Sequence, residues 1–208
     1  MADRRIAPVQ QGSQKVITGL CTSRNPGLWF VVAALLAAAP AWGETFNGTV
    51  VDVSRGDTLT VRDRDKRRHR VRLVAVEAPE PGQAFGPDSR RSLSKLLLGK
   101  RVAVERRKED SYGRTIGKVL VAPLGCAACA PTRDAGLAQL EAGLAWWQRD
   151  ERREQALADQ AYYEYAEFDA RMRRIGLWSD DAPQAPWEWR KRGGRAYMTL
   201  LGRVQGSI

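Results

Sequence analysis

The stretch Arg72-Leu-Val-Ala-Val-Glu77-Ala-Pro-Glu80 carries an arginine and two acids from a strand into a turn. At its start, apolar side chains alternate with arginines, with the period of two that a strand shows when one face is buried. The proline before Glu80 ends the strand, because proline has no backbone N–H to donate to a sheet. The three charged residues therefore reach a strand end that faces solvent, where we expect the chemistry of the protein.

Short strands with tight connections surround this stretch. Apolar alternation and turn residues predict strands at residues 46–53, 58–64, 68–76 and 101–105, and a fifth that ends at Val121. Gly86-Pro87-Asp88 predicts a helix start between the third and fourth strands, and Gly99 ends that helix. Five short strands with one helix between the third and fourth are typical of a small OB-type β-barrel, so we expect an α+β fold.

After the barrel the apolar spacing becomes helical. One helix is predicted from Asp134 to about Trp147, and a second from about Glu151 to Arg174. The second has an apolar stripe that we expect to face the barrel core: Leu157, Ala161, Tyr165, Phe168, Met172 and Ile175. Residues 179–208 are predicted to be a basic C-terminal tail that contains tryptophan and proline and ends in disorder.

Residues 1–43 have the features of an export signal. Basic residues precede an unbroken apolar run of 12 residues, Leu28 to Ala39, and Ala41-Trp-Gly43 places small residues at −3 and −1 of a cleavage site. Twelve residues are too few to cross about 30 Å of hydrocarbon as a helix. We expect a cleaved signal peptide and a secreted or periplasmic protein without stable membrane association. An uncleaved anchor and an over-extended start are the alternatives. We also expect a monomer.

The charge of the chain suits a polyanionic partner. Four of the 34 Lys and Arg residues and one of the 24 Asp and Glu residues lie in residues 1–43, which leaves a net charge of +7 for the rest. Such an excess favours binding to nucleic acid but does not establish it, since many secreted proteins are basic.

Two cysteines remain after residue 43, Cys126 and Cys129. A closed zinc site needs about four ligands, and the single histidine, His69, lies far off in a charged run, so structural zinc is disfavoured. In an oxidising compartment we expect the two cysteines to form a short-loop disulfide. A redox-active pair is the alternative, but the surrounding sequence lacks a thioredoxin-like pattern of strand and helix.

The charged residues match what phosphodiester hydrolysis requires. Negative charge builds on the phosphoryl oxygens, so cations must be aimed there and a base must orient the attacking water. Asp57 and Glu77 could supply hard oxygen ligands for Ca²⁺ or Mg²⁺, and Glu80, between two prolines, could be the base. Arg72 and Arg114 could each grip a phosphate through two N–H groups. The alternative is that these are ordinary turn acids and surface arginines.

Four separated motifs resemble those of the staphylococcal nuclease (thermonuclease) family, in the same order over roughly residues 46–178. They are Gly56-Asp-Thr58, Arg72–Glu80, Asp110-Ser-Tyr-Gly-Arg114 and Gly143-Leu-Ala-Trp-Trp147. The resemblance implies an OB-fold barrel with flanking helices in residues 44–178, and Ca²⁺-dependent cleavage of DNA and RNA.

The resemblance also implies a role for each residue of the site. Asp57, Glu77 and the backbone carbonyl of Ala78 would hold Ca²⁺. Glu80 would assist the attack by water, and Arg72 and Arg114 would bind the phosphate. Tyr112, Trp146 and Trp147 are further candidates for contact with substrate, since aromatic side chains stack on bases in single-strand binders. For the two tryptophans, packing within the protein is the alternative.

Three positions depart from the pattern of the family. Glu77 stands where an aspartate is usual, Ala78 replaces a threonine, and Arg55 replaces an acid two residues before Asp57. The loss of a negative charge at position 55 should weaken metal binding. Family members without these acids bind nucleic acid without cleaving it, so a non-cleaving binding module is the alternative function, and an OB-type structural or partner-binding protein is the third.

Overall fold

The computed structural model describes residues 44–193, so the predicted signal peptide and residues 194–208 of the predicted tail lie outside the described residues. Five strands form a closed barrel: β1 (Thr45–Val53), β2 (Thr58–Asp63), β3 (Arg68–Leu73), β5 (Arg101–Glu109) and β6 (Thr115–Val121). Neighbouring strands are antiparallel except β3 and β6, which pair in parallel and close the barrel. The predicted five-stranded OB-type barrel is confirmed.

Alternation along each strand fills the barrel. Val50, Leu59, Val61, Val71 and Val104 are almost completely buried and belong to one continuous core. Burial of this apolar surface is the main term that stabilises the barrel. The fourth strand is longer than predicted and reaches Glu109, because its charged second half still pairs with β6 while its side chains stay partly in solvent.

The third strand is shorter than predicted. β3 ends at Leu73, and Ala75 adopts a left-handed backbone conformation, with φ 53°, that a strand cannot contain. The chain then resumes as the two-residue strand β4 (Val76–Glu77), which pairs with β8 (Trp146–Trp147) rather than with the barrel. This break turns Glu77 away from the barrel and toward the C-terminal half of the chain.

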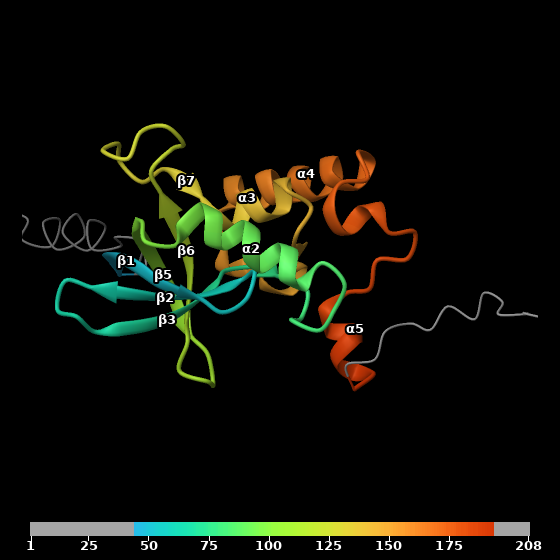
Figure 1. Cartoon of the computed structure of the whole chain (residues 1–208), viewed down its shortest axis with the longest axis horizontal. Coiled ribbons are helices and arrows are strands. Elements are labelled where there is room, and N and C mark those ends of the chain that lie inside the picture. The colour runs from blue at the N-terminus through green and yellow to red at the C-terminus, as the bar shows by residue number, and fades with distance from the viewer. Residues whose placement is uncertain (1–43, 194–208) are drawn as a thin grey trace, which may run out of the picture. The chain divides into compact units, whose positions relative to one another are not determined.

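Helices lie along one side of the barrel (Figure 1). They are α2 (Gly86–Leu97), α3 (Ala135–Glu141) and α4 (Leu157–Met172), and the two-residue strand β7 (Arg133–Asp134) leads into α3. The single helix predicted from Glu151 to Arg174 is wrong in part: the 3₁₀ helix η1 (Arg149–Glu154) and an extended break at Gln155 precede α4. A second 3₁₀ helix, η2 (Gly176–Ser179), and α5 (Pro186–Lys191) follow.

The predicted core face of α4 is also wrong. Leu157, Tyr165, Phe168 and Met172 are exposed, and the buried face contains Tyr163, Ala166, Glu167 and Ala170. Tyr163 donates its hydroxyl to Asp134 at 2.9 Å, while Glu167 accepts from the backbone N–H of Trp147 at 3.0 Å. Buried polar groups are tolerated when they are hydrogen-bonded, so this face packs inward, mainly against α3 and β8, although it is less apolar than its opposite.

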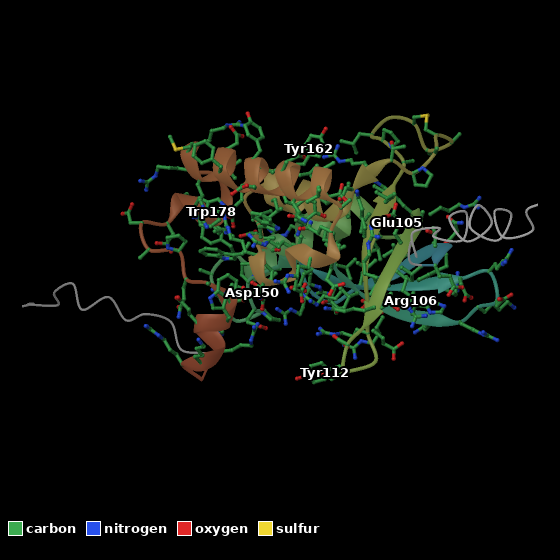
Figure 2. The ribbon with its side chains drawn as sticks, turned by 180° about the vertical axis from the view of Figure 1, so that it is seen from behind. Glu105, Arg106, Tyr112, Asp150, Tyr162 and Trp178 are labelled. Carbon is green, nitrogen blue, oxygen red and sulfur yellow. A yellow bond between two sulfur atoms is a disulfide. The ribbon has the colours of Figure 1, made fainter. Side chains whose placement is uncertain are left out.

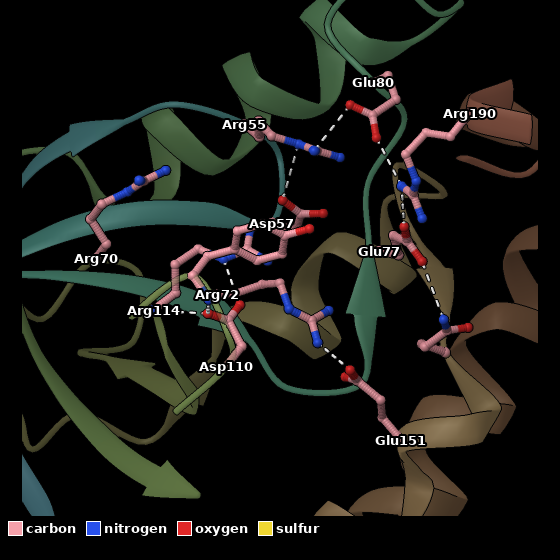
Figure 3. Close-up of a pocket in the computed structure, with 12 residues that line it drawn as sticks. Arg55, Asp57, Arg70, Arg72, Glu77, Glu80, Asp110, Arg114, Glu151 and Arg190 are labelled. Atoms are coloured by element: carbon pink, nitrogen blue, oxygen red, sulfur yellow. Dashed lines mark hydrogen bonds and ion pairs between the residues drawn. The ribbon is translucent and has the colours of Figure 1, made fainter. Parts of the chain in front are cut away.

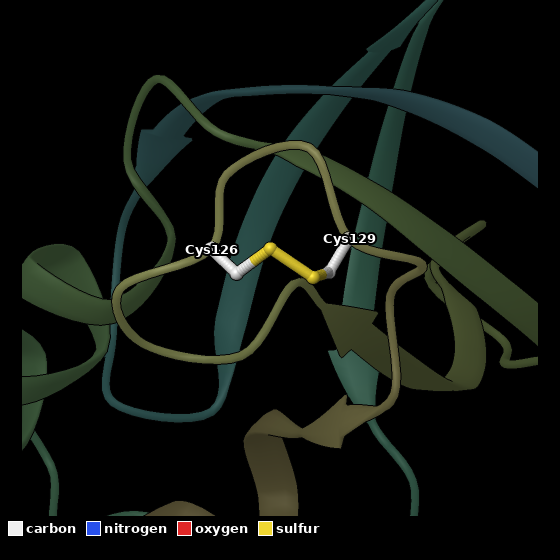
Figure 4. The surroundings of a disulfide bond; sticks show 2 residues. All are labelled: Cys126 and Cys129. Atoms are coloured by element: carbon white, nitrogen blue, oxygen red, sulfur yellow. A yellow bond between two sulfur atoms is a disulfide. The ribbon is translucent and has the colours of Figure 1, made fainter.

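The loop between β6 and β7 contains a disulfide. Cys126 and Cys129 are joined, with their Cα atoms 5.4 Å apart (Figure 4). Neither cysteine lines the cavity described below, whose lining comes from other segments.

Within residues 44–193, no helix is both long and apolar enough to span a bilayer.

Candidate active site

A cavity of about 550 Å³ opens at the end of the barrel where β3 ends and β2 and β6 begin (Figure 3). Its lining is almost entirely acids and arginines: Arg55, Asp57, Arg70, Arg72, Glu77, Glu80, Asp110, Tyr112, Arg114, Gln148, Glu151 and Arg190. Six residues predicted from the sequence meet here, namely Asp57, Arg72, Glu77, Glu80, Tyr112 and Arg114.

Asp57 is fixed at the floor of the cavity. It is 2% exposed, and one carboxylate oxygen accepts the Thr58 hydroxyl at 2.7 Å while the other accepts the backbone N–H of Ala78 at 2.9 Å. A Cβ at Gly56 would collide with the side chain of Ser89, so only glycine fits directly before this aspartate. Asp57 and Ala78, 21 residues apart, are thus held together as the resemblance requires.

Glu77 and Glu80 stand on the opposite wall. Glu77 is the cross-strand partner of Trp146 and accepts from the Gln148 side chain at 3.3 Å. Both glutamates bind one guanidinium, that of Arg190, at 2.5 Å from Glu77 and 2.8 Å from Glu80. Partial burial would lower the pKa of Arg190, but the hydrogen bonds and charges of Glu80 and Glu77 together outweigh it and raise the pKa.

Arg55 reaches three of the predicted functional groups. Its guanidinium lies 3.0 Å from a carboxylate oxygen of Glu80 and 3.5 Å from one of Asp57, and it donates to the carbonyl of Ala78 at 3.4 Å (Figure 3). The residue that replaces an acid of the family pattern therefore places a fixed positive charge among the oxygens predicted to hold a metal ion.

Arg72 is held in place by Glu151 of η1. One carboxylate oxygen of Glu151 pairs with the Arg72 guanidinium, and the other accepts the backbone N–H of Ala75 at 3.1 Å. The carbonyl of Ala75 accepts the backbone N–H of Gln148 at 2.9 Å. These contacts hold Ala75 in its left-handed conformation and fix both the arginine before it and the glutamate after it.

Arg114 is held by Asp110 across the turn between β5 and β6. Asp110 accepts the Arg114 side chain at 2.7 Å and the backbone N–H groups of Arg114 and Tyr112, each at 2.9 Å. Burial would raise the pKa of Asp110, but these hydrogen bonds outweigh it and the pKa is lowered. The carboxylate stays ionised and keeps the arginine aimed into the cavity.

The three predicted aromatic contacts differ in position. Tyr112 is 78% exposed at the tip of the β5–β6 hairpin, with the Arg114 guanidinium 5.4 Å from its ring (Figure 2). Trp146 and Trp147 are buried and do not line the cavity. Trp147 belongs to the barrel core, and Trp146 packs edge-on against Trp178. The tryptophans therefore support the packing alternative, because stacking on a base would require them to leave the interior.

Three residues of the site escaped the sequence prediction. Gln148 contacts Glu77, which lies 71 residues earlier in the chain. Glu151 contacts Arg72, 79 residues earlier. Arg190 contacts Glu77 and Glu80, about 110 residues earlier. No local pattern encodes such pairs. The one available signal was composition, since Trp187–Arg192 is a basic, aromatic stretch directly after a proline-rich linker.

The donor chemistry of the cavity suits a hard cation. Asp57, Glu77 and the Ala78 carbonyl offer oxygen atoms only, and guanidinium groups already bind each of them. Among residues 44–193, no three His, Cys, Asp or Glu side chains converge on one point. Because guanidinium groups bind the three oxygen donors, a divalent cation would have to displace Arg55 and Arg190 from them.

Comparison with known proteins agrees with this architecture. The model of the staphylococcal nuclease homologue family matches residues 70–180. Protein ParB of Escherichia coli is 39% identical over 160 residues, which cover 77% of this chain and 87% of that protein. Micrococcal nuclease of Shigella flexneri is 39% identical over 167 residues, 78% of this chain and 90% of the relative. An uncharacterized endonuclease of Haemophilus influenzae is 34% identical over 143 residues, 69% and 72% of the two chains.

The closed barrel and its charged cavity define an OB-fold protein whose site is built from acids and arginines at one barrel end. The chain belongs to the staphylococcal nuclease homologue family. Asp57, Arg55 and Arg190 lie outside the segment that the family model matches.

Proposed function

We propose that the protein is an exported, Ca²⁺-dependent nuclease that hydrolyses the phosphodiester bonds of DNA or RNA without sequence specificity. The observation that carries this proposal is the meeting of Asp57, Arg72, Glu77, Glu80 and Arg114 in one cavity. These residues come from four segments of the chain, and ordinary surface charges would have no reason to share one solvent-open pocket.

The arginines would bind and stabilise the phosphate. Arg72 and Arg114 are each held by one carboxylate, so their guanidinium groups are oriented before substrate arrives. A planar guanidinium offers two parallel N–H donors to a phosphate, and its charge offsets the negative charge that builds on the phosphoryl oxygens. Contacts of this kind go to the backbone of nucleic acid and carry no base information, which fits cleavage without sequence specificity.

Glu80 would accept a proton from the attacking water. It is only partly exposed, and it lines the cavity on the same wall as Glu77. Asp57, Glu77 and the Ala78 carbonyl would hold Ca²⁺, which when bound supplies a Lewis acid that polarises a phosphoryl oxygen. The buried position of Asp57 and its two hydrogen bonds keep this donor in place.

Two further observations support parts of the proposal. Relatives that align over most of their length are named micrococcal nuclease and endonuclease, which supports hydrolysis of nucleic acid. The basic start, apolar run and small residues of positions 1–43 support export.

Incubation of the purified protein with linear and circular DNA and with RNA tests the activity. We expect loss of full-length substrate with Ca²⁺ and none with a chelator. Glu80→Gln should lower the rate by about 10²- to 10⁴-fold, the range typical for loss of a general base. Intact substrate under every condition would disprove the enzyme proposal.

A non-cleaving nucleic-acid-binding module is the second candidate. The observation that favours it is the pairing of Glu80 with two arginines, Arg55 and Arg190, which occupy both of its carboxylate oxygens. Such a module would retard nucleic acid in a gel without metal, and Glu80→Gln would leave that binding unchanged. The two candidates therefore separate in the same set of assays.

A further inference from the structure

The C-terminal helix α5 ends at the cavity although it lies outside the family match, which stops at residue 180. Its Arg190 is one of the cavity-lining residues, and Figure 3 shows its side chain reaching across to Glu77 and Glu80. Of the four paired arginines in the cavity, Arg190 is the most exposed, with half of its side chain open to solvent.

The packing of α5 explains why Arg190 points this way. Trp187 packs edge-on against Trp146, with ring centroids 5.7 Å apart, and Ala185 is buried in the same apolar cluster. Gln83 also donates its side-chain N–H to the carbonyl of Gln184. Residues three apart lie on the same face of a helix, so the anchored Trp187 turns Arg190 toward the same wall.

That wall is the one that carries Glu77. Trp146, the anchor of α5, is the cross-strand partner of Glu77 in the β4–β8 pair. The same two-stranded sheet thus positions an acid predicted to hold a metal ion and the helix that delivers a guanidinium to it. The contact between Arg190 and Glu77 thus depends on the β4–β8 pairing and on the packing of Trp187 against Trp146, and is not the chance approach of a long surface side chain.

We propose that Arg190 is an intramolecular counter-cation of the active site, which neutralises Glu77 and Glu80 and competes with a divalent cation for Glu77. The inference rests on the proposed function, because it assigns Glu77 to cation binding and Glu80 to proton transfer. A guanidinium on these carboxylates stabilises two like charges held close together. It also means that cation binding includes breaking the Arg190–Glu77 ion pair, so Arg190 sets the Ca²⁺ concentration at which the site fills.

A calorimetric titration of the full-length protein with CaCl₂, without nucleic acid, tests this role. Arg190→Gln should bind Ca²⁺ about three- to tenfold more tightly than the wild type, the range expected when a partly exposed ion pair no longer competes. Arg190→Lys keeps the charge but loses the planar guanidinium, so its affinity for Ca²⁺ should lie between those of the wild type and Arg190→Gln. Lys191→Gln removes the same charge from the same helix but does not line the cavity, and its affinity should stay close to that of the wild type.

The outcomes separate this inference from the proposed function. If Ca²⁺ supports cleavage and all variants titrate like the wild type, the role of Arg190 is disproved and the nuclease proposal stands. If Lys191→Gln tightens binding as much as Arg190→Gln, the effect is general charge and the specific role is again disproved. If no variant binds Ca²⁺ and none cleaves, both proposals fail. Near-UV circular dichroism of the tryptophans around Trp187 checks that each variant keeps α5 in place.

Discussion

Glu151 holds Arg72 from a position 79 residues later in the chain, and its second carboxylate oxygen binds the backbone N–H of Ala75. One side chain thereby fixes a phosphate-directed arginine and the left-handed turn that leads to Glu77. The geometry of the site consequently depends on η1, a segment with no predicted chemical role.

Glu151→Gln should impair the reaction although Glu151 is not expected to touch substrate. The neutral glutamine side chain has one acceptor oxygen in place of two charged ones, so it binds Arg72 and the backbone N–H of Ala75 less strongly than the carboxylate does. Arg72 then loses its fixed orientation. We expect a roughly tenfold loss in kcat/KM for nucleic acid cleavage. Glu154→Gln is the matched control, because Glu154 lies on the same 3₁₀ helix but pairs with Lys108. Equal losses in both variants would contradict a specific role for Glu151.

The turn that carries Arg114 should be sensitive to acid. The pKa of Asp110 is lower in the folded protein than its ordinary value of 3.8, because hydrogen bonds from Arg114 and Tyr112 outweigh burial. Its contribution to stability is therefore complete above the unfolded pKa and is lost as the pH falls through the folded pKa. Urea unfolding at pH 7 should show Asp110→Asn less stable than the wild type, and the difference should shrink at pH 3. A constant difference at both values would argue against this ionisation.

Substitutions on the two faces of α4 should change the stability of the protein by different amounts. Tyr163→Phe removes the hydroxyl that binds buried Asp134, and we expect a loss of about 1–3 kcal/mol in the free energy of unfolding. Phe168→Ser acts on the exposed apolar face, where changes usually stay within about 0.5 kcal/mol. Equilibrium unfolding in urea measures both. A larger loss for Phe168→Ser would mean that another surface covers this face.

Arg55→Asp should strengthen cation binding at the expense of stability without the cation. The substitution removes the guanidinium from Asp57 and Glu80 and adds a negative charge beside them. Ca²⁺ affinity should rise by roughly tenfold, since acid count tunes such sites. Without Ca²⁺ the unfolding temperature should fall through repulsion, and with Ca²⁺ it should recover. Arg91→Asp, the same charge change on the exposed side of α2, should leave the dependence of the unfolding temperature on Ca²⁺ as it is in the wild type.

The barrel and much of the site followed from local patterns. Alternation along β1, β2 and β3 marks one buried face whatever the rest of the chain does, and glycine and proline mark the turns. Asp57, Arg72, Glu77, Glu80 and Arg114 could be named because each sits at a strand end within a short motif. Their convergence followed from the order of the strands, since a barrel brings such ends together.

The interior of the helical half did not follow from local patterns. The most apolar stripe of α4 faces solvent, because Glu167 and Tyr163 on the opposite face are paired with groups distant in sequence. Arg190 and Glu151 join the site through contacts of the same kind. A side chain that is buried or positioned by a distant partner looks, in the sequence, like any other surface charge.

The parallel pairing of β3 with β6 has a consequence for folding. Arg72 lies within this pairing, opposite Ile116, and Arg114 immediately precedes it, so the two arginines become neighbours only when the barrel closes. Contacts between segments this far apart in sequence form late and slowly, since the intervening chain must first be ordered. We therefore expect affinity for nucleic acid to return only in the last refolding phase. Stopped-flow refolding with a fluorescent oligonucleotide would show this as a lag behind the recovery of secondary structure, and simultaneous recovery would exclude it.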